Sequence, residues 1–171
     1  MRTRAKFEKV SFEQFMKDWV KTFPEDENNK EFIVEIYEGI KLPERSTSKS
    51  AGYDFFIPMD VDFAKNTEML IPTGIRCVNM ADDDVLKIYP RSGLGTKYGF
   101  VPMNLTGIID ADYADSKNEG HINMRMKNGD EELELDAGKA FCQGIFSKYG
   151  TTADDKTTEE VRNGGFGSTN K

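Results

Sequence analysis

The sequence predicts an all-β fold, a sandwich or barrel-like body, with one extra helix at its N-terminus. Two observations predict it. From about residue 31 onward, short apolar or alternating runs follow one another closely and are separated by turns rich in Gly, Pro and Asp. Ahead of that point, apolar residues recur at spacings of three and four, the period of a helix. At 171 residues, the chain has the length of a single domain with a sizeable core.

The helix is expected over residues 11–23. Ser11 and Gln14 have the spacing of a capping box, and Pro24 with the polar stretch after it marks the end of the helix. Because the segment carries no reactive group, we expect it to pack on the main body or on a partner subunit. Its apolar face would consist of Phe12, Phe15, Met16, Trp19 and Phe23.

Three regions are expected along the chain: a helical extension at 1–30, a β-rich core at 31–149 and a flexible arm at 150–171. The arm has few apolar side chains ahead of its terminal glycines. The strands of the core are expected at 32–37, 53–57, 67–71, 74–79, 85–89, 100–103, 106–109, 121–126, 131–135 and 140–147.

The composition argues against two classes of partner. A net charge of −7 is unfavourable for general binding to nucleic acid, which requires a basic surface. The apolar runs fall far short of the roughly 20 residues that a membrane helix needs, and the N-terminus lacks the apolar run of a signal peptide. We therefore expect neither a nucleic-acid partner nor a membrane.

Few side chains are available for chemistry. Cys77 and Cys142 lie in apolar segments, which is typical of buried free thiols in a reducing compartment, so a cytoplasmic location is expected. His121 is the one histidine, and no cysteine or second histidine has zinc-ligand spacing to it. Acid–base chemistry must therefore fall to carboxylates.

A glycine-containing corner follows the apolar strand at 85–89. In the segment 90–95, the glycines allow backbone N–H groups to converge, and Arg91 and Ser92 add further donors. The segment is either an anion-binding corner or an exposed turn with an unpaired arginine.

Carboxylates occur at two further candidate positions. Asp110 and Asp112 lie at the end of an apolar strand that follows a hairpin at 104–107. They could hold or deprotonate a water molecule, or they could be solvated turn residues. Asp54 follows a turn of small residues and could face the water shell of a metal ion.

The last ten residues have the composition of a clamp for a ligand. Phe166 lies among three glycines, which let the backbone approach a ligand closely. Arg162, Ser168 and Thr169 can donate hydrogen bonds to phosphate oxygens. An aromatic ring beside such donors suits a ligand with a flat base and phosphates, whereas the alternative is a frayed terminus.

Taken together in order, five segments resemble the five motifs of the trimeric dUTPases. The resemblance runs from about residue 40 to the C-terminus and leaves out the first 30 residues. The segments are Ala51-Gly52-Tyr53-Asp54, Pro90-Arg91-Ser92-Gly93-Leu94-Gly95, Gly107-Ile108-Ile109-Asp110-Ala111-Asp112-Tyr113, Gly138-Lys139-Ala140-Phe141-Cys142-Gln143 and Gly164-Gly165-Phe166-Gly167-Ser168-Thr169.

The resemblance implies Mg²⁺-assisted hydrolysis of dUTP to dUMP and pyrophosphate by a homotrimer of jelly rolls, with each active site built from all three chains. Asp110 would activate the attacking water. Tyr113 would pack on the deoxyribose, and the hairpin from Asn104 to Gly107 would bind uracil, over which Phe166 would stack.

The resemblance also assigns the phosphate contacts. Asp54 would meet Mg²⁺ through water, because the metal is held mainly by the phosphates. The remaining implied contacts are Arg91, Ser92, Gly93 and Gln143 for the triphosphate, and Arg162, Ser168 and Thr169 for the γ-phosphate.

The sequence departs from the family pattern at three places. Arg162 lies four residues before Phe166, where the family has five. Residues 114–118 form an insertion after Tyr113, and the last motif ends in Asn170 in place of glycine.

Two other functions are considered. A dCTP deaminase or bifunctional relative would need a catalytic glutamate where this chain has Arg125, and would lack the terminal clamp. A non-catalytic protein that senses dUTP is the other alternative, since the extra helix and the insertion near Lys117 could contact a partner.

Overall fold

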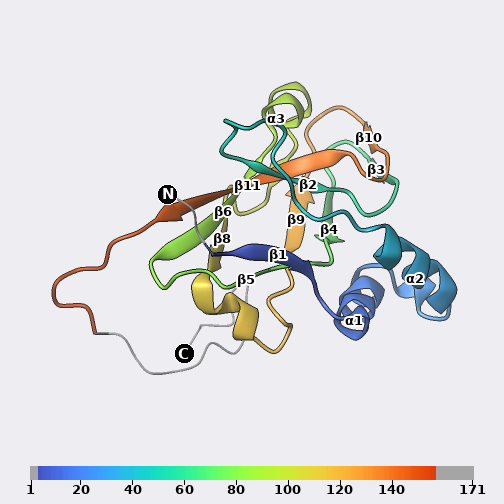
Figure 1. Ribbon diagram of the computed structural model, residues 1–171. Helices are drawn as coiled ribbons and strands as arrows, with labels where there is room; N and C mark the ends of the chain where they lie inside the picture. Colours follow the sequence, from blue (N-terminus) through green and yellow to red (C-terminus); the bar gives the residue numbers. More distant parts are fainter. Residues whose placement is uncertain (1–3, 157–171) are drawn as a thin grey trace.

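The computed structural model describes residues 4–156 of the chain. This part is mainly β-sheet, and α1 and α2 lie together at one end of the molecule (Figure 1). The elements are β1 (Lys6–Lys9), α1 (Phe12–Thr22), the 3-10 helix η1 (Pro24–Asp26), α2 (Lys30–Gly39), β2 (Tyr53–Phe56), β3 (Val61–Phe63), β4 (Glu68–Pro72), β5 (Ile75–Val78), β6 (Asp84–Pro90), α3 (Ser92–Tyr98), β7 (Val101–Pro102), β8 (Gly107–Asp110), the 3-10 helix η2 (Ala111–Asp115), β9 (Asn123–Lys127), β10 (Leu133–Leu135) and β11 (Ala140–Lys148).

Within residues 4–156, the strands form four antiparallel sheets. The largest has the order β2-β11-β6-β8, and a second has the order β4-β9-β7. Two-stranded sheets pair β1 with β5 and β10 with β3. Nine of the ten expected strands correspond to β2 and to β4 through β11, so the all-β prediction is confirmed.

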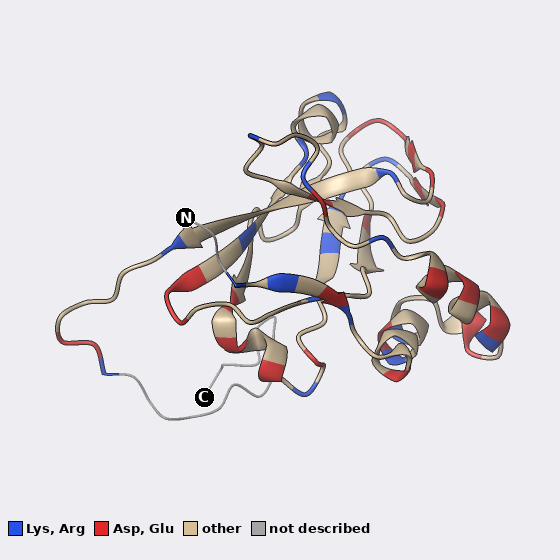
Figure 2. Cartoon of the chain, viewed as in Figure 1, with Lys and Arg blue, Asp and Glu red and all other residues tan. Residues whose placement is uncertain are grey.

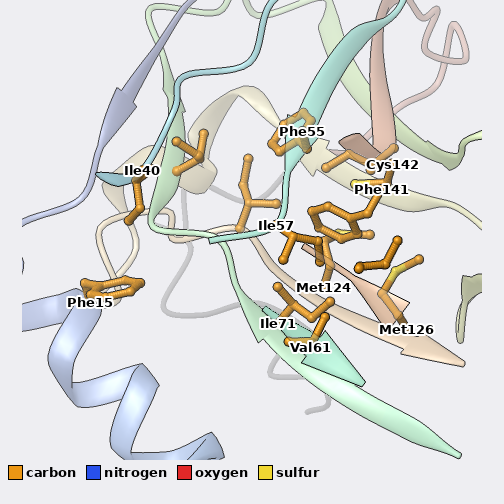
Figure 3. Packing of buried hydrophobic residues seen from close by; sticks show 14 of the residues in the cluster. Phe15, Ile40, Phe55, Ile57, Val61, Ile71, Met124, Met126, Phe141 and Cys142 are labelled. Carbon is orange, nitrogen blue, oxygen red and sulfur yellow. The ribbon is translucent and has the colours of Figure 1, made fainter. Parts of the chain in front are cut away.

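Side chains of the two larger sheets meet in one core (Figure 3). Phe55 from β2, Phe141 from β11 and Met124 from β9 are almost completely buried there. Gly144 lets β11 run close to its neighbours, because a Cβ at this position would lie 2.9 Å from Leu86 and 3.0 Å from Phe55. The central strand, which carries Gln143, is thereby fixed in the sheet.

The predicted N-terminal helix is confirmed as α1. The Ser11 hydroxyl accepts a hydrogen bond from the Gln14 backbone N–H at 3.1 Å, which is one half of the expected capping box. The other half comes from elsewhere, because Glu119 accepts the Ser11 backbone N–H at 2.8 Å and the Ser11 hydroxyl at 2.6 Å. Phe15 and Trp19 are fully buried, so the helix packs on the body as expected.

The strand expected at 32–37 is wrong, because these residues belong to helix α2. The run of β-branched residues favours a strand by local preference. However, Ile33, Ile36 and Ile40 follow the helical spacing and are all buried. The helical part of the N-terminal region therefore continues to Gly39, beyond the expected limit at residue 30.

A buried polar cluster joins α1 to the loop before β9. His121 is fully buried, and its Nε2 accepts the Gly74 backbone N–H at 2.8 Å. Its Nδ1 therefore carries the proton in this geometry and donates to Asp18 Oδ2 at 2.7 Å. Burial alone would raise the pKa of Asp18, but hydrogen bonds from His121, Gln14 and Asn123 hold that pKa well below its usual range.

The expectation of buried free thiols is confirmed. Cys77 and Cys142 are both buried and unpaired. Burial raises the pKa of the Cys77 thiol to about 12, so it is not a reactive thiolate at neutral pH. None of the helices within residues 4–156 is long and apolar enough to span a bilayer.

Candidate active site

Strand pairing brings two of the predicted phosphate contacts, Arg91 and Gln143, together with Asp54, the predicted partner of the metal. In the largest sheet, Gln143 of β11 lies opposite Asp54 on one side and Tyr89 on the other. Arg91 follows directly after β6, and its Nη1 donates to Asp54 Oδ2 at 2.5 Å. The Arg91 side chain is 40% exposed and that of Asp54 is 14% exposed. Arg91 is therefore paired and partly buried, and the alternative of an unpaired arginine in an exposed turn is wrong.

Gln143 is held in place beside this ion pair. Its Nε2 donates to the Pro90 carbonyl at 3.2 Å. The chain passes so close to its amide at Gly52 that a Cβ there would lie 2.4 Å from Gln143 Oε1. A side chain at position 52 would displace the amide, which gives the glycine of the first motif a physical reason.

Ser92 and Gly93 lie in the first turn of α3, a short helix that the sequence pattern does not predict. Both residues are exposed, and nothing lies within 4 Å of a Cβ built at Gly93. The corner ends at Gly99, which has the left-handed conformation expected of a helix C-cap. These two residues thus lie beside the Arg91–Asp54 pair with open space in front of them.

The hairpin expected at 104–107 is wrong: the segment is a tight turn, the β7–β8 turn, between two strands that belong to different sheets and do not pair with each other. Leu105 has a positive φ of 63°, and the Thr106 N–H donates to the Asn104 carbonyl at 2.7 Å, so the chain turns tightly there. Asn104 is exposed at this turn. Gly107 lies opposite Ile88 of β6, where an added Cβ would lie 3.3 Å from the Ile88 Cβ.

Asp110 ends β8 and is half-buried. It lines a cavity of about 710 Å³ between η2, the β5–β6 turn and the segment after β11. The cavity wall is strongly polar and contains three further carboxylates and one guanidinium. The lining residues are Arg76, Val78, Asn79, Met80, Asp82, Asp110, Ala111, Asp112, Ala114, Asp115 and Tyr149.

Tyr113 is almost fully buried, with 3% of its surface exposed. Its hydroxyl donates to the His121 carbonyl at 3.0 Å and accepts from Asn118 Nδ2 at 3.0 Å. Its own carbonyl accepts from the Ser116 hydroxyl at 2.6 Å. The insertion at 114–118 therefore folds around this ring, and a contact between Tyr113 and a sugar stays a prediction.

The predicted general base, Asp110, lies far from the predicted phosphate contacts within one chain. Asp110 lies opposite Val85 at the start of β6, whereas Arg91 follows the end of the same strand. Six residues of extended chain separate these two positions, which corresponds to about 20 Å. A single chain does not bring Asp110 next to the cluster of Arg91, Asp54 and Gln143.

The comparisons with known proteins decide the family. The family model described as dUTPase matches residues 38–170. The chain is 43% identical over 134 residues to the deoxyuridine 5'-triphosphate nucleotidohydrolase of Lactococcus lactis, which covers 77% of this chain and 89% of that protein. It is 36% identical over 138 residues to the enzyme of the same name from Tolumonas auensis, covering 76% and 87%.

The chain belongs to the dUTPase family.

Solved structures of dUTPases have the same fold. The dUTPase of Streptococcus mutans is 36% identical and superposes with a TM-score of 0.59 over 67% of this chain and 90% of its own. The dUTPase of Staphylococcus bacteriophage 80alpha superposes with a TM-score of 0.64 over 99% of both chains at 19% identity, a likeness of fold alone. The predicted dUTPase-like jelly roll is confirmed.

Four members of the predicted site lie outside the part of the chain that the structure describes. Arg162, Phe166, Ser168 and Thr169 lie outside residues 4–156. The region matched by the family model begins at residue 38, so β1, α1, η1 and most of α2 lie outside the match.

The carboxylates available at the candidate site indicate how a Mg²⁺ ion could be held. Within residues 4–156, no three His, Cys, Asp or Glu side chains cluster as a metal site would require. Mg²⁺ keeps several waters and is commonly held by one or two carboxylates together with substrate phosphates. A single carboxylate, Asp54, beside the predicted phosphate contacts fits that mode of binding.

Proposed function

We propose that this dUTPase hydrolyses dUTP to dUMP and pyrophosphate, and that Asp110 is the general base. In this reaction, Asp110 takes a proton from a water whose oxygen attacks the α-phosphorus. The bond between the α-phosphorus and the bridging oxygen breaks, and pyrophosphate leaves. The observation that carries the proposal is the place of Asp110, a half-buried carboxylate at the end of β8 that lines an open cavity in a chain of this family.

We further propose that each site is built by a homotrimer. The separation of about 20 Å along β6 between Asp110 and Arg91 favours a site whose parts come from different copies. Apolar side chains at the β7–β8 turn also favour a subunit contact, since Leu105 is 73% exposed and Ile108 is 50% exposed.

The triphosphate is proposed to bind at the end of β6. Because Asp54 already holds the Arg91 guanidinium, little side-chain freedom is lost when a phosphate takes up the donors of Arg91. Ser92, Gly93 and the Gln143 amide add further donors at the same corner.

Mg²⁺ bound to the triphosphate would offset the negative charge that develops on the phosphate oxygens. Asp54 would hold it through water, as the single carboxylate at the triphosphate corner. The other groups there act by positioning: in phosphoryl transfer, most of the catalysis comes from alignment and from donors aimed at the phosphates.

The uracil base and the deoxyribose are proposed to bind at the β7–β8 turn. Asn104 and the backbone up to Gly107 would bind uracil, and Tyr113 would form a fixed wall against a 2′-hydroxyl. The hydrogen bonds on Tyr113 support this role because they hold the ring rigidly. The terminal clamp of Phe166, with Arg162, Ser168 and Thr169 on the γ-phosphate, would complete the site.

Deamination of dCTP is disfavoured by the position that would carry its glutamate. Arg125 of β9 pairs with Glu68 of β4 at 2.9 Å, and the Arg125 side chain is 52% exposed on the sheet surface. A guanidinium at this position cannot take a proton from the water that must add to the cytosine ring, which a catalytic glutamate could do.

The test is pyrophosphate release from dUTP, dCTP, dTTP and UTP, each with Mg²⁺ and with excess EDTA. We expect turnover of dUTP alone, and a large loss of turnover in EDTA. Release of ammonia from dCTP, or equal turnover of dTTP, would show that the proposed substrate is wrong.

The role of Asp110 is tested by Asp110→Asn. A general base contributes about 10²- to 10⁴-fold to a rate, so kcat should fall by about that factor while dUTP binding is retained. Calorimetry with a non-hydrolysable dUTP analogue measures the binding. A variant that keeps near wild-type turnover would exclude Asp110 as the base. If the wild-type chain binds dUTP but shows no turnover, the sensing alternative is correct.

A further inference from the structure

A second cavity lies between the N-terminal helices and the β-sheet body, at the end of the molecule where α1 and α2 gather (Figure 1). Its volume is about 660 Å³, and none of the candidate active-site residues lines it. We call it the helix groove. It is lined by Phe23, Glu25, Asp26, Phe32, Glu35, Ile36, Gly39, Lys41, Ile57, Pro58, Met59, Asp60, Ala137 and Gly138.

The floor of the helix groove is apolar. Phe32 of α2 is 39% exposed, and it is the only phenylalanine within residues 4–156 among the exposed large apolar side chains. Ile36 and Ile57 beside it are buried, and Met59 is partly buried. Binding of a partner's apolar side chain over this exposed ring would be favourable, because it removes apolar surface from water.

The rim of the helix groove is acidic. Four carboxylates and one ammonium line the groove, a net charge of −3. Asp26 accepts a hydrogen bond from the Trp19 indole N–H, and Asp60 accepts one from the Ala137 backbone N–H. In the described part of the chain, Glu25 and Glu35 have no ion-pair partner. In Figure 2, acidic positions recur along α1 and α2 at this end of the molecule.

Charge complementarity selects the partner. A second copy of this chain, which itself carries a charge of −7, would place like charges together if the same face met itself. A segment with bulky apolar side chains flanked by Lys or Arg would cover Phe32 and pair with Glu25 and Glu35. We propose that the helix groove binds a cationic amphipathic segment of another protein.

The test uses a fluorescein-labelled helical peptide with Leu and Phe along one face and Lys along the other. A second peptide has Glu in place of every Lys. We expect the Lys peptide to raise the fluorescence anisotropy saturably with the full-length chain, and the Glu peptide not to bind. The absence of saturable binding by the Lys peptide, or equal binding of the two peptides, would refute the proposal.

Variants locate the binding. Glu35→Lys and Phe32→Ala should each raise the Kd of the Lys peptide by about tenfold or more, as expected for central contacts of an interface. Glu31→Lys is the matched control, since it makes the same charge change on the same exposed helix outside the groove and should shift the Kd by less than about twofold. If Glu31→Lys weakens binding as much as Glu35→Lys, the peptide binds by non-specific attraction to the negative charge of the protein, and the proposal fails.

Two further measurements keep the outcome clear. dUTP turnover by Phe32→Ala and Glu35→Lys should equal that of the wild type, which separates a local effect from misfolding and from a failure of the proposed function. Light scattering of the wild type and of Phe32→Ala should give the same mass. A lower mass for the variant would mean that a second copy of the chain occupies the groove, which would overturn the proposal.

Discussion

At the residue scale, the carboxylate of Asp18 joins helix α1 to the β-sheet body. Its Oδ2 accepts from His121 Nδ1 and Gln14 Nε2, both at 2.7 Å, and from Asn123 Nδ2 at 3.3 Å. The pairing with His121 spans 103 residues of sequence. The sequence could exclude a zinc role for the lone histidine, but it could not reveal this partner, because neither residue belongs to a local motif.

Asp18→Asn should destabilise the protein by about 1–3 kcal/mol at neutral pH, because a buried charge-assisted acceptor is replaced by an amide that matches its donors less well. The depressed pKa of Asp18 gives this loss a pH dependence. Its stabilisation is present above the unfolded-state pKa, near 3.9, and is lost as the pH falls below that value towards the folded-state pKa. The difference between variant and wild type should therefore shrink in strong acid.

The measurement for Asp18→Asn is urea unfolding at a fixed protein concentration, from pH 7 down to pH 3. Glu13→Gln, which removes an exposed carboxylate from the same helix, is the control and should have little effect. A pH-independent difference between Asp18→Asn and wild type would show that the charge of Asp18 contributes nothing.

At the element scale, the local sequence predicts helix α1 but only part of the hydrogen bonding that caps its N-terminus. The spacing of Ser11 and Gln14 was sufficient to place the N-terminus of α1, yet the second half of the cap comes from Glu119. Helix α2 shows the opposite case: its β-branched run resembles a strand, and packing of Ile33, Ile36 and Ile40 on the body overrides that preference.

Ser11→Ala should lower the free energy of unfolding by about 0.5–2 kcal/mol, the usual range for loss of an N-cap. Part of this cost should depend on Glu119, because the Ser11 hydroxyl also donates to that carboxylate at 2.6 Å. A double-mutant cycle with Glu119→Ala, read by urea unfolding, should therefore show coupling of about 0.5 kcal/mol or more between the two sites. Additive effects would mean that the contact with Glu119 does not stabilise α1.

At the scale of the whole molecule, the resemblance predicts a set of site residues and a site built from all three chains, but it does not say which of those residues lie together in one chain. The register of β11 gathers Asp54, Gln143 and Arg91 as the resemblance implies. Pairing of β8 with β6 carries Asp110 to the other end of the sheet. Motif order along a chain contains no information on strand register, so only the structure shows that Asp110 is the residue that lies apart from the other three.

This separation makes a prediction that a single-chain site cannot satisfy. Asp110→Asn and Arg91→Ala should each be inactive alone, but chains of the two variants unfolded together and refolded in equal amounts should regain activity. If Asp110 and Arg91 of each site come from different chains, random assembly leaves both intact in about one quarter of the sites. The rate of pyrophosphate release from dUTP gives the fraction of active sites, and mass spectrometry confirms that mixed trimers have formed. Each variant refolded alone is the control, and mixed trimers without activity would place both residues of every site in the same chain.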